Sequence, residues 1–253
     1  MARCPREESS SGIYHIMLRG INRQDIFIDD ADRRRFLETI WHYKPISQFA
    51  LYGYCLMDNH IHLLLKEGAE PISLVVKRIS SSFVYWYNRK YERSGHLFQG
   101  RFKSEVVESE GYFLTVLRYI HQNPVPANLA KNILEYKWSS AADYLETSTE
   151  IDIEYALGMF STDRAQAVRR LMRYMQEDNE DRCLDNDDRK PGPTDSQLRS
   201  YFAGLGLTDI SKLKRLEKGR RDEIIRDLKT LEGVTVRQLS RLTGISKSVI
   251  SRV

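Results

Sequence analysis

The sequence predicts an α+β protein: a ferredoxin-like antiparallel sheet with helices on one face, followed by a small all-α domain. The first observation is the order of strand-like and helix-like segments, β-α-β-β-α-β-α, whose first six members match the ferredoxin-like plan. The second is a basic C-terminal stretch that follows an acidic, polar one, which indicates a separate unit. The third is length, since 253 residues accommodate one ordinary domain and a smaller one.

The composition is that of a water-soluble protein. Hydrophobic residues make up 41% of the chain and charged residues 29%, and no apolar run approaches the ~18 residues of a membrane span. The first residues lack the apolar segment of a secretory signal. Three widely spaced cysteines indicate neither a disulfide framework nor a zinc cluster. We therefore expect a cytoplasmic protein with no membrane partner.

The first four elements are expected between residues 13 and 66. Residues 13–18 have the composition of a strand, and an Asp-rich turn precedes a helix over 31–43 with an apolar face. Two apolar, strand-like runs follow at 49–57 and 60–66. The dipeptide Asp58-Asn59 between them is typical of a tight turn, so these runs form a hairpin.

Three more elements complete the expected first domain. Pro71 begins a long helix over 71–91, and residues 102–108 alternate as a strand does. Residues 110–122 have helical periodicity, and a further stretch over 139–177 is also expected to be helical.

Charge and composition divide the remainder of the chain. The formal net charge is +2 over residues 1–149, −4 over 150–190 and +6 over 191–253. The acidic stretch also holds a Pro-Gly-Pro sequence and few apolar residues, which is typical of a linker. The expected parts are a catalytic domain (1–145), a helical extension (146–177), an acidic linker (178–195) and a helix-turn-helix domain (196–253).

His60 and His62 form an HxH pair in the second strand of the hairpin. Side chains at i and i+2 project from the same face of a strand, so two imidazoles at this spacing can bind one metal ion. The alternative is two histidines on a half-polar sheet face. A metal site would need a further donor, and an amide oxygen with waters would suit Mg²⁺ or Mn²⁺.

Tyr119 and Asn123 share one face at the end of the helix over 110–122. A hydroxyl and an amide could therefore approach the sheet together. A tyrosine, with its pKa near 10, needs activation to act as a nucleophile. The alternatives are a core tyrosine and an ordinary helix-terminal asparagine before Pro124.

Five segments together resemble the REP-associated tyrosine transposases, single-tyrosine members of the HUH transposases of bacteria. In chain order they are YHIMLRGINRQDIF (14–27), YGYCLMDNHIHLLL (52–65), GHLFQGRFKS (95–104), RYIHQNPVPANL (118–129) and WSS (138–140). The resemblance covers roughly residues 12–145. It implies a ferredoxin-like catalytic domain and a divalent metal ion, Mg²⁺ or Mn²⁺.

The resemblance also implies roles for individual residues. His60 and His62 correspond to the metal-binding histidines, Tyr119 to the nucleophile and Asn123 to the third metal donor. Relatives often have Gln at that last position, so Gln122 remains an alternative donor. Tyr112 remains an alternative nucleophile, because paired tyrosines occur in the wider HUH group of relaxases and replication initiators.

Two sets of basic and polar residues are expected to contact DNA in this domain. The first set lies in a loop whose glycines would let the backbone approach a DNA strand closely, and the resemblance implies that this loop contacts DNA. Its members are His96, Gln99, Arg101 and Lys103. Arg19 and Arg23, after the first strand, are weaker candidates of the same kind.

Residues 235–253 have the pattern of a helix-turn-helix. Two short amphipathic helices flank Gly244, and the second is expected to present Lys247, Ser248 and Arg252 outward. These helices belong to residues 191–253, whose net charge is +6, and this stretch is therefore expected to bind DNA. It resembles the helix-turn-helix extensions fused to some longer members of the family. The alternative is a helical hairpin that serves an interface.

The resulting hypothesis is a metal-dependent endonuclease and strand transferase that acts on single-stranded DNA at hairpin-forming, REP-like repeats. It would proceed through a 5′-phosphotyrosine intermediate, mobilise DNA or repeats, and associate with the nucleoid. The alternative is a regulatory protein that keeps the fold and binds repeat DNA without cutting it. The sequence leaves open the DNA site, the metal used in the cell and whether the protein is a monomer or a homodimer.

Overall fold

The centre of the computed structural model is a four-stranded antiparallel sheet. The structure describes residues 6–146, 150–178, 180–181, 183–184, 193–207 and 210–253. The strands are β1 (Ile13–Arg19), β2 (Ala50–Leu56), β3 (His60–Lys66) and β4 (Lys103–Val106), in the spatial order β2-β3-β1-β4. All three strand pairs are antiparallel. This order is that of the ferredoxin-like plan and confirms the predicted fold class.

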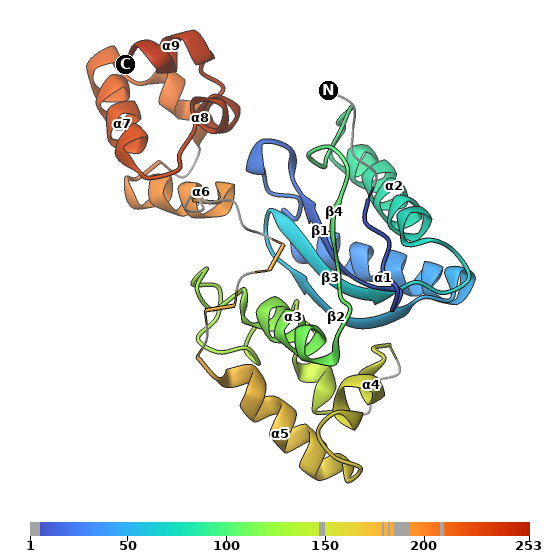
Figure 1. Cartoon of the computed structure of the whole chain (residues 1–253). Helices are drawn as coiled ribbons and strands as arrows, with labels where there is room; N and C mark the ends of the chain where they lie inside the picture. Colours follow the sequence, from blue (N-terminus) through green and yellow to red (C-terminus); the bar gives the residue numbers. More distant parts are fainter. Residues whose placement is uncertain (1–5, 147–149, 179, 182, 185–192, 208–209) are drawn as a thin grey trace.

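Helices cover both faces of the sheet. Figure 1 shows α1 (Asp30–Ser47) and α2 (Ile72–Lys90) on one side and α3 (Glu110–Gln122) on the other. The expected arrangement, with helices on one face, therefore holds for α1 and α2 of the ferredoxin-like unit. The next helix, α3, covers the second face. That face also carries buried side chains, such as Cys55 and Leu64, which need a covering layer.

Local signals explain where these helices begin. Asp29 caps α1 by accepting a hydrogen bond from the Asp32 backbone N–H, and the Asp32 side chain bonds back to complete a capping box. Pro71 precedes α2, and Ser109 caps α3. Each of these residues satisfies or removes a donor that the first turn would otherwise leave unbonded.

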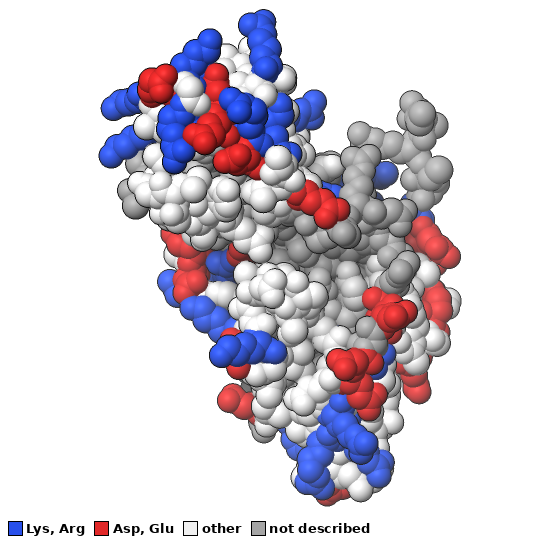
Figure 2. Space-filling view, turned by 90° about the vertical axis from the view of Figure 1, so that its left-hand side faces the viewer, with Lys and Arg blue, Asp and Glu red and all other residues white. Residues whose placement is uncertain are grey.

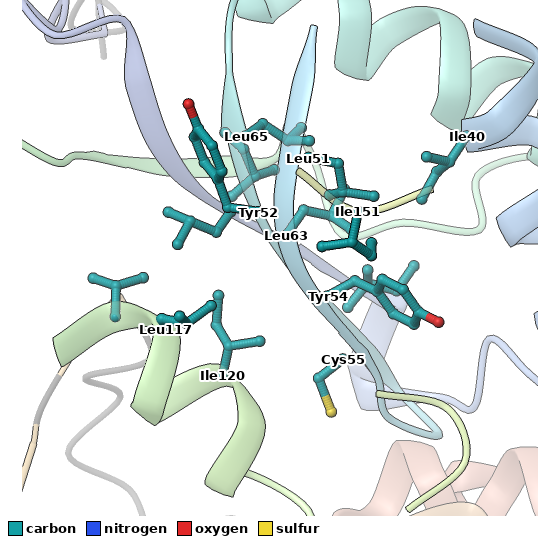
Figure 3. Close-up of a cluster of buried hydrophobic side chains, with 14 of the residues drawn as sticks. Ile40, Leu51, Tyr52, Tyr54, Cys55, Leu63, Leu65, Leu117, Ile120 and Ile151 are labelled. Atoms are coloured by element: carbon teal, nitrogen blue, oxygen red, sulfur yellow. The ribbon is translucent and has the colours of Figure 1, made fainter. Parts of the chain in front are cut away.

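The core lies between the sheet and its helices. Figure 3 shows Leu117 and Ile120 of α3 and Ile40 of α1 approaching the strands from opposite sides. All three side chains are fully buried, as are Leu51 and Leu65. The helix α3 packs closely, because a Cβ at Gly53 of β2 would lie 3.0 Å from Cδ1 of Leu117. This close contact fixes the height of α3 above the sheet.

Among the described residues of the stretch 139–177, helical structure is confined to three pieces. These are the 3₁₀ turn η2 (Ala142–Tyr144), α4 (Ile153–Gly158) and α5 (Arg164–Gln176). The intervening chain is bonded to the edge strand β2: the Tyr144 hydroxyl donates to the Tyr52 carbonyl, and Asp152 accepts from the Leu51 backbone N–H. These bonds hold the segment along β2, so a single long helix does not form.

Much of the expected linker over 178–195 lies outside the described residues. Asp181 pairs with Arg118 of α3 at 2.8 Å, and Cys183 is buried against the first domain. The Leu184 backbone N–H donates to the Glu105 carboxylate of β4. The described part of this stretch thus contacts the first domain.

The C-terminal part forms a second helical unit with its own core. Phe202, Leu213, Leu228, Leu239 and Ile250 are buried there, apart from the main core. Its elements are α6 (Asp195–Gly204), η3 (Ile210–Arg215), α7 (Lys218–Thr230), α8 (Val236–Thr243) and α9 (Lys247–Arg252).

The expected helix pair around Gly244 is present. The turn between α8 and α9 places Gly244 at φ 69°, in the left-handed region that favours glycine. No helix in the described part of the chain is long and apolar enough to cross a membrane.

Asp143 of η2 supplies a test of this packing. Burial, with the nearby Glu146 and Glu150 carboxylates, raises its pKa from 3.8 to about 6. The cost of ionising Asp143 is absent below the unfolded pKa, grows as pH rises between these two values, and is complete above the folded one. We expect Asp143→Asn to increase the free energy of unfolding at pH 7.5 by about 1 kcal/mol, allowing for partial exposure.

The measurement is urea unfolding at pH 7.5 and pH 3.5. At the lower pH, Asp143→Asn and wild type should agree. Glu38→Gln, at an exposed pair on α1, serves as the control and should show no such pH dependence. An equal effect of Asp143→Asn at both pH values would contradict this explanation.

Candidate active site

A cavity of about 1090 Å³ opens at the end of the sheet where β3 begins. Its lining includes the HxH strand, the end of α3 and the loop that follows β1. The residues of interest in this lining are Arg19, Arg23, Asn59, His60, Tyr119, Gln122 and Asn123. The fold therefore brings residues from three distant parts of the chain to one site.

The two histidines of the HxH pair lie side by side on the face covered by α3. Their ring centroids are 5.0 Å apart and the rings are nearly perpendicular. The His60 Nδ1 lies 2.6 Å from Oδ1 of Asn59, and since an amide oxygen only accepts, Nδ1 donates and Nε2 keeps the lone pair. The sequence-predicted geometry of one shared face is thus present.

His62 is completely buried and held neutral. Burial, and then the nearby His60, His15 and Arg19, lower its pKa well below the usual value. Its Nε2 atom has no hydrogen-bond partner among the described residues. A neutral imidazole with an unbonded buried nitrogen has the chemistry of a metal ligand.

Tyr119 lies over His62 and over a third histidine, His15 of β1. Its ring centroid is 5.7 Å from that of His62 and 6.0 Å from that of His15. Tyr112, two turns earlier on α3, is placed differently: it does not line the cavity, and its hydroxyl bonds to Glu105. Burial, followed by that bond, raises the pKa of Tyr112. Tyr119 is the better placed of the two for attack on a ligand in the cavity.

The two candidate amide donors have different surroundings. Gln122 donates from Nε2 to the backbone carbonyls of Met175 and Glu177, at 2.9 and 3.0 Å. Asn123 donates from Nδ2 to the Tyr119 carbonyl at 2.8 Å, a bond that does not engage its Oδ1. Both amides thus bond through nitrogen, so these bonds do not decide which amide oxygen would bind a metal ion. The resemblance to the transposase family favours Asn123, and Gln122 stays the alternative.

The donor chemistry fits a hard divalent cation with an incomplete protein ligand set. Within the described ranges, no group of three or more His, Cys, Asp and Glu side chains could hold a metal ion. Two imidazoles therefore need an amide, water or phosphate oxygen to complete a site. Such a mixed set, rich in oxygen, suits Mg²⁺ or Mn²⁺ and leaves positions for substrate.

His15 and Glu105 belong to this site and were not identified from the sequence. The His15 Nε2 lies 2.9 Å from Nδ1 of His62, and the His15 Nδ1 lies 3.5 Å from Oε2 of Glu105. In the strand register, His15 is opposite Leu64 and Glu105, so His62 is its diagonal neighbour. The strand pairing of the ferredoxin-like plan, combined with the HxH motif, could have indicated His15.

The predicted DNA-contact residues of the first domain divide into two groups. Arg19 and Arg23 line the cavity, as a site for phosphates requires. The others are exposed and outside the lining: His96, Gln99, Arg101 and Lys103. The loop before β4 is hydrogen-bonded to the end of β1, because the Gln99 backbone N–H donates to the Arg19 carbonyl at 2.7 Å.

The second unit contributes to the same cavity through α6. Thr194 and Gln197 are among its lining residues, and the Asp195 backbone N–H donates to the Asp25 carboxylate at 3.2 Å. The predicted DNA contacts of this unit are exposed on α9 and outside the lining: Lys247, Ser248 and Arg252. Figure 2 shows Lys and Arg side chains gathered over this unit.

Comparisons with known proteins agree on one family. Residues 8–123 match the family model described as "Transposase IS200 like". The curated relative "Putative REP-associated tyrosine transposase" of Haemophilus influenzae is 22% identical over 154 residues, which covers 55% of this chain and 85% of the relative. The structure of a REP-associated tyrosine transposase bound to a REP hairpin is 14% identical, with a TM-score of 0.52, and the match covers 73% of this chain and 96% of that one. At that identity, the structural match establishes the fold.

Proposed function

We propose that the protein cleaves and rejoins single-stranded DNA at hairpin-forming repeats, on the premise that residues 8–123, which match the IS200-like transposase model, form a domain of that kind. Tyrosine transposases are enzymes that cut and rejoin DNA. The observation that carries the proposal is the position of Tyr119, which lies over His62 of the HxH pair in a cavity also lined by His60, Arg19 and Arg23. A nucleophile, a metal-binding pair and phosphate-binding cations are the three components this chemistry needs.

In the proposed reaction, the Tyr119 hydroxyl oxygen attacks a phosphodiester phosphorus. A bond forms between the tyrosine oxygen and phosphorus, and the bond between phosphorus and O3′ breaks. The leaving O3′ ends as a free 3′-OH, and the proton that tyrosine loses balances the proton that O3′ gains. The product is a 5′-phosphotyrosine link, which preserves the ester. A second 3′-OH can then attack this link, which rejoins DNA and releases Tyr119 without an external energy source.

The surrounding residues have binding and orienting roles. Arg19 and Arg23 offer positive charge to the phosphates that flank the reacting one. His60, His62 and Asn123 would hold the divalent cation. When bound, that cation would supply positive charge to the phosphate oxygens and make the phosphorus a better electrophile.

A hairpin-bound structural relative supports the choice of substrate. The exposed group His96, Gln99, Arg101 and Lys103 would extend the contact along the DNA backbone beyond the cavity. The C-terminal unit, with its exposed Lys247, Ser248 and Arg252, would bind a duplex stem or flanking duplex through α9. A homodimer is compatible with this arrangement but not required by it.

The nucleophile is tested by removing its oxygen. With a labelled single-stranded hairpin and Mn²⁺, Tyr119→Phe should form no covalent adduct on a denaturing gel, because phenylalanine has no attacking oxygen. Its hairpin affinity should stay within about twofold of wild type. Tyr112→Phe is the matched control and should still form the adduct; the opposite pattern would assign the nucleophile to Tyr112.

The metal donors are tested by Mn²⁺ titration of cleavage. His60→Ala and His62→Ala should each abolish Mn²⁺-dependent adduct formation. Asn123→Ala should raise the Mn²⁺ concentration needed for half-maximal cleavage by roughly 10-fold or more. Gln122→Ala should raise it less, since the resemblance to the transposase family favours Asn123 as the third donor. The reverse order would move the third donor to Gln122.

Duplex binding by α9 is tested by the salt dependence of affinity. If Lys247 and Arg252 contact phosphates, the double variant Lys247→Ala/Arg252→Ala should flatten the slope of log affinity against log salt by about 0.9 per lost duplex contact. Arg34→Ala, at an exposed position on α1, is the control and should leave the slope unchanged. An unchanged slope in the double variant would exclude a phosphate-binding role for these α9 residues.

A further inference from the structure

We infer that Glu105 and His15 are positioning residues that determine which ring nitrogen of His62 carries its proton, and thereby present Nε2 as the metal-binding atom. The inference rests on the proposed function, because it assumes that the HxH pair binds a divalent cation. It assigns roles to two residues outside the HxH motif, on β1 and β4.

Three side chains form a continuous line across the sheet. The Glu105 Oε2 lies 3.5 Å from Nδ1 of His15, and the His15 Nε2 lies 2.9 Å from Nδ1 of His62. Both histidines are completely buried. At the end of this line, the Nε2 atom of His62 has no hydrogen-bond partner in the described part of the chain.

The charge of Glu105 determines which ring nitrogens of His15 and His62 carry protons. Burial acts to raise the pKa of Glu105, but interactions with His15, Tyr112 and the Leu184 backbone outweigh it, so the carboxyl has a lowered pKa. A carboxylate favours the proton on the nearer nitrogen of His15, Nδ1. In neutral His15, Nε2 is then an acceptor, which requires His62 to donate from Nδ1. The lone pair of His62 therefore resides on Nε2.

The neighbouring ligand has an equivalent arrangement. His60 donates from Nδ1 to Oδ1 of Asn59, which likewise places its lone pair on Nε2. Each imidazole of the HxH pair is thus oriented through Nδ1 by a different partner. For His60 the partner precedes it in the chain, whereas for His62 it is supplied by the pairing of β1 with β3.

The tautomer is tested in the metal-free protein by long-range ¹H–¹⁵N NMR of the histidine rings. Wild type should show His62 protonated at Nδ1 and unprotonated at Nε2. His15→Leu and Glu105→Gln should shift this population toward the Nε2-protonated form. Glu108→Gln, a nearby carboxylate that bonds to Ser10, is the control and should not. A wild-type His62 protonated at Nε2 would overturn the inference.

The consequence for binding is tested by titrating free Mn²⁺ by electron paramagnetic resonance. His15→Leu and Glu105→Gln should weaken Mn²⁺ affinity by roughly 10–100-fold. His15→Gln should restore most of it, because an amide can accept from His62 and donate to Glu105. Thermal melts identify any variant that fails to fold, and the rescue by His15→Gln separates positioning from packing.

The His62→Ala variant distinguishes failure of the proposed metal site from failure of the positioning role alone. If wild type and His62→Ala bind Mn²⁺ equally, the metal site itself is wrong, and the inference fails with it. If His62→Ala loses Mn²⁺ whereas His15→Leu binds it as tightly as wild type does, the metal site stands and only the positioning role is overturned.

Discussion

The register of β1 with its two neighbours is the constraint on which the site depends. Met17 pairs with His62 on β3, and His15 pairs with Glu105 on β4. A slip of one residue would turn every side chain of β1 to the opposite face and separate His15 from His62. The buried apolar residues of β1, which include Ile16 and Leu18, oppose such a slip because they belong to the core. Core packing and site geometry are therefore fixed by the same pairing.

The helix α3 depends on that sheet for its position. Gly53 lets α3 approach closely at Leu117, and Leu117 lies two residues before Tyr119. The pair Arg118–Asp181 and the Gln122 bonds to Met175 and Glu177 join the other sides of α3 to later parts of the chain. Tyr119 is thus held over the histidines from several directions, which favours a preorganised nucleophile.

Sequence reasoning identified what is encoded locally. The strand order, the HxH face and the one-turn spacing of Tyr119 and Asn123 follow from periodicities of two and 3.6 residues. His15 and Glu105 were missed because their role depends on pairing between strands about 45 and 90 residues apart, which spacing along one strand cannot reveal. The contact of α6 with the cavity was missed for the same reason, since it joins Asp195 to Asp25. The division of the chain into four parts stays a prediction.

The central claim is that Tyr119 becomes covalently linked to DNA, and peptide mapping of the trapped adduct tests it most directly. After reaction with a single-stranded hairpin and Mn²⁺, nuclease trimming and trypsin digestion, mass spectrometry should locate a nucleotide on the peptide that spans residues 119–131. Fragmentation should place it on Tyr119, the only tyrosine in that span. A nucleotide on any other tyrosine, Tyr112 in particular, would contradict the assignment of the active site.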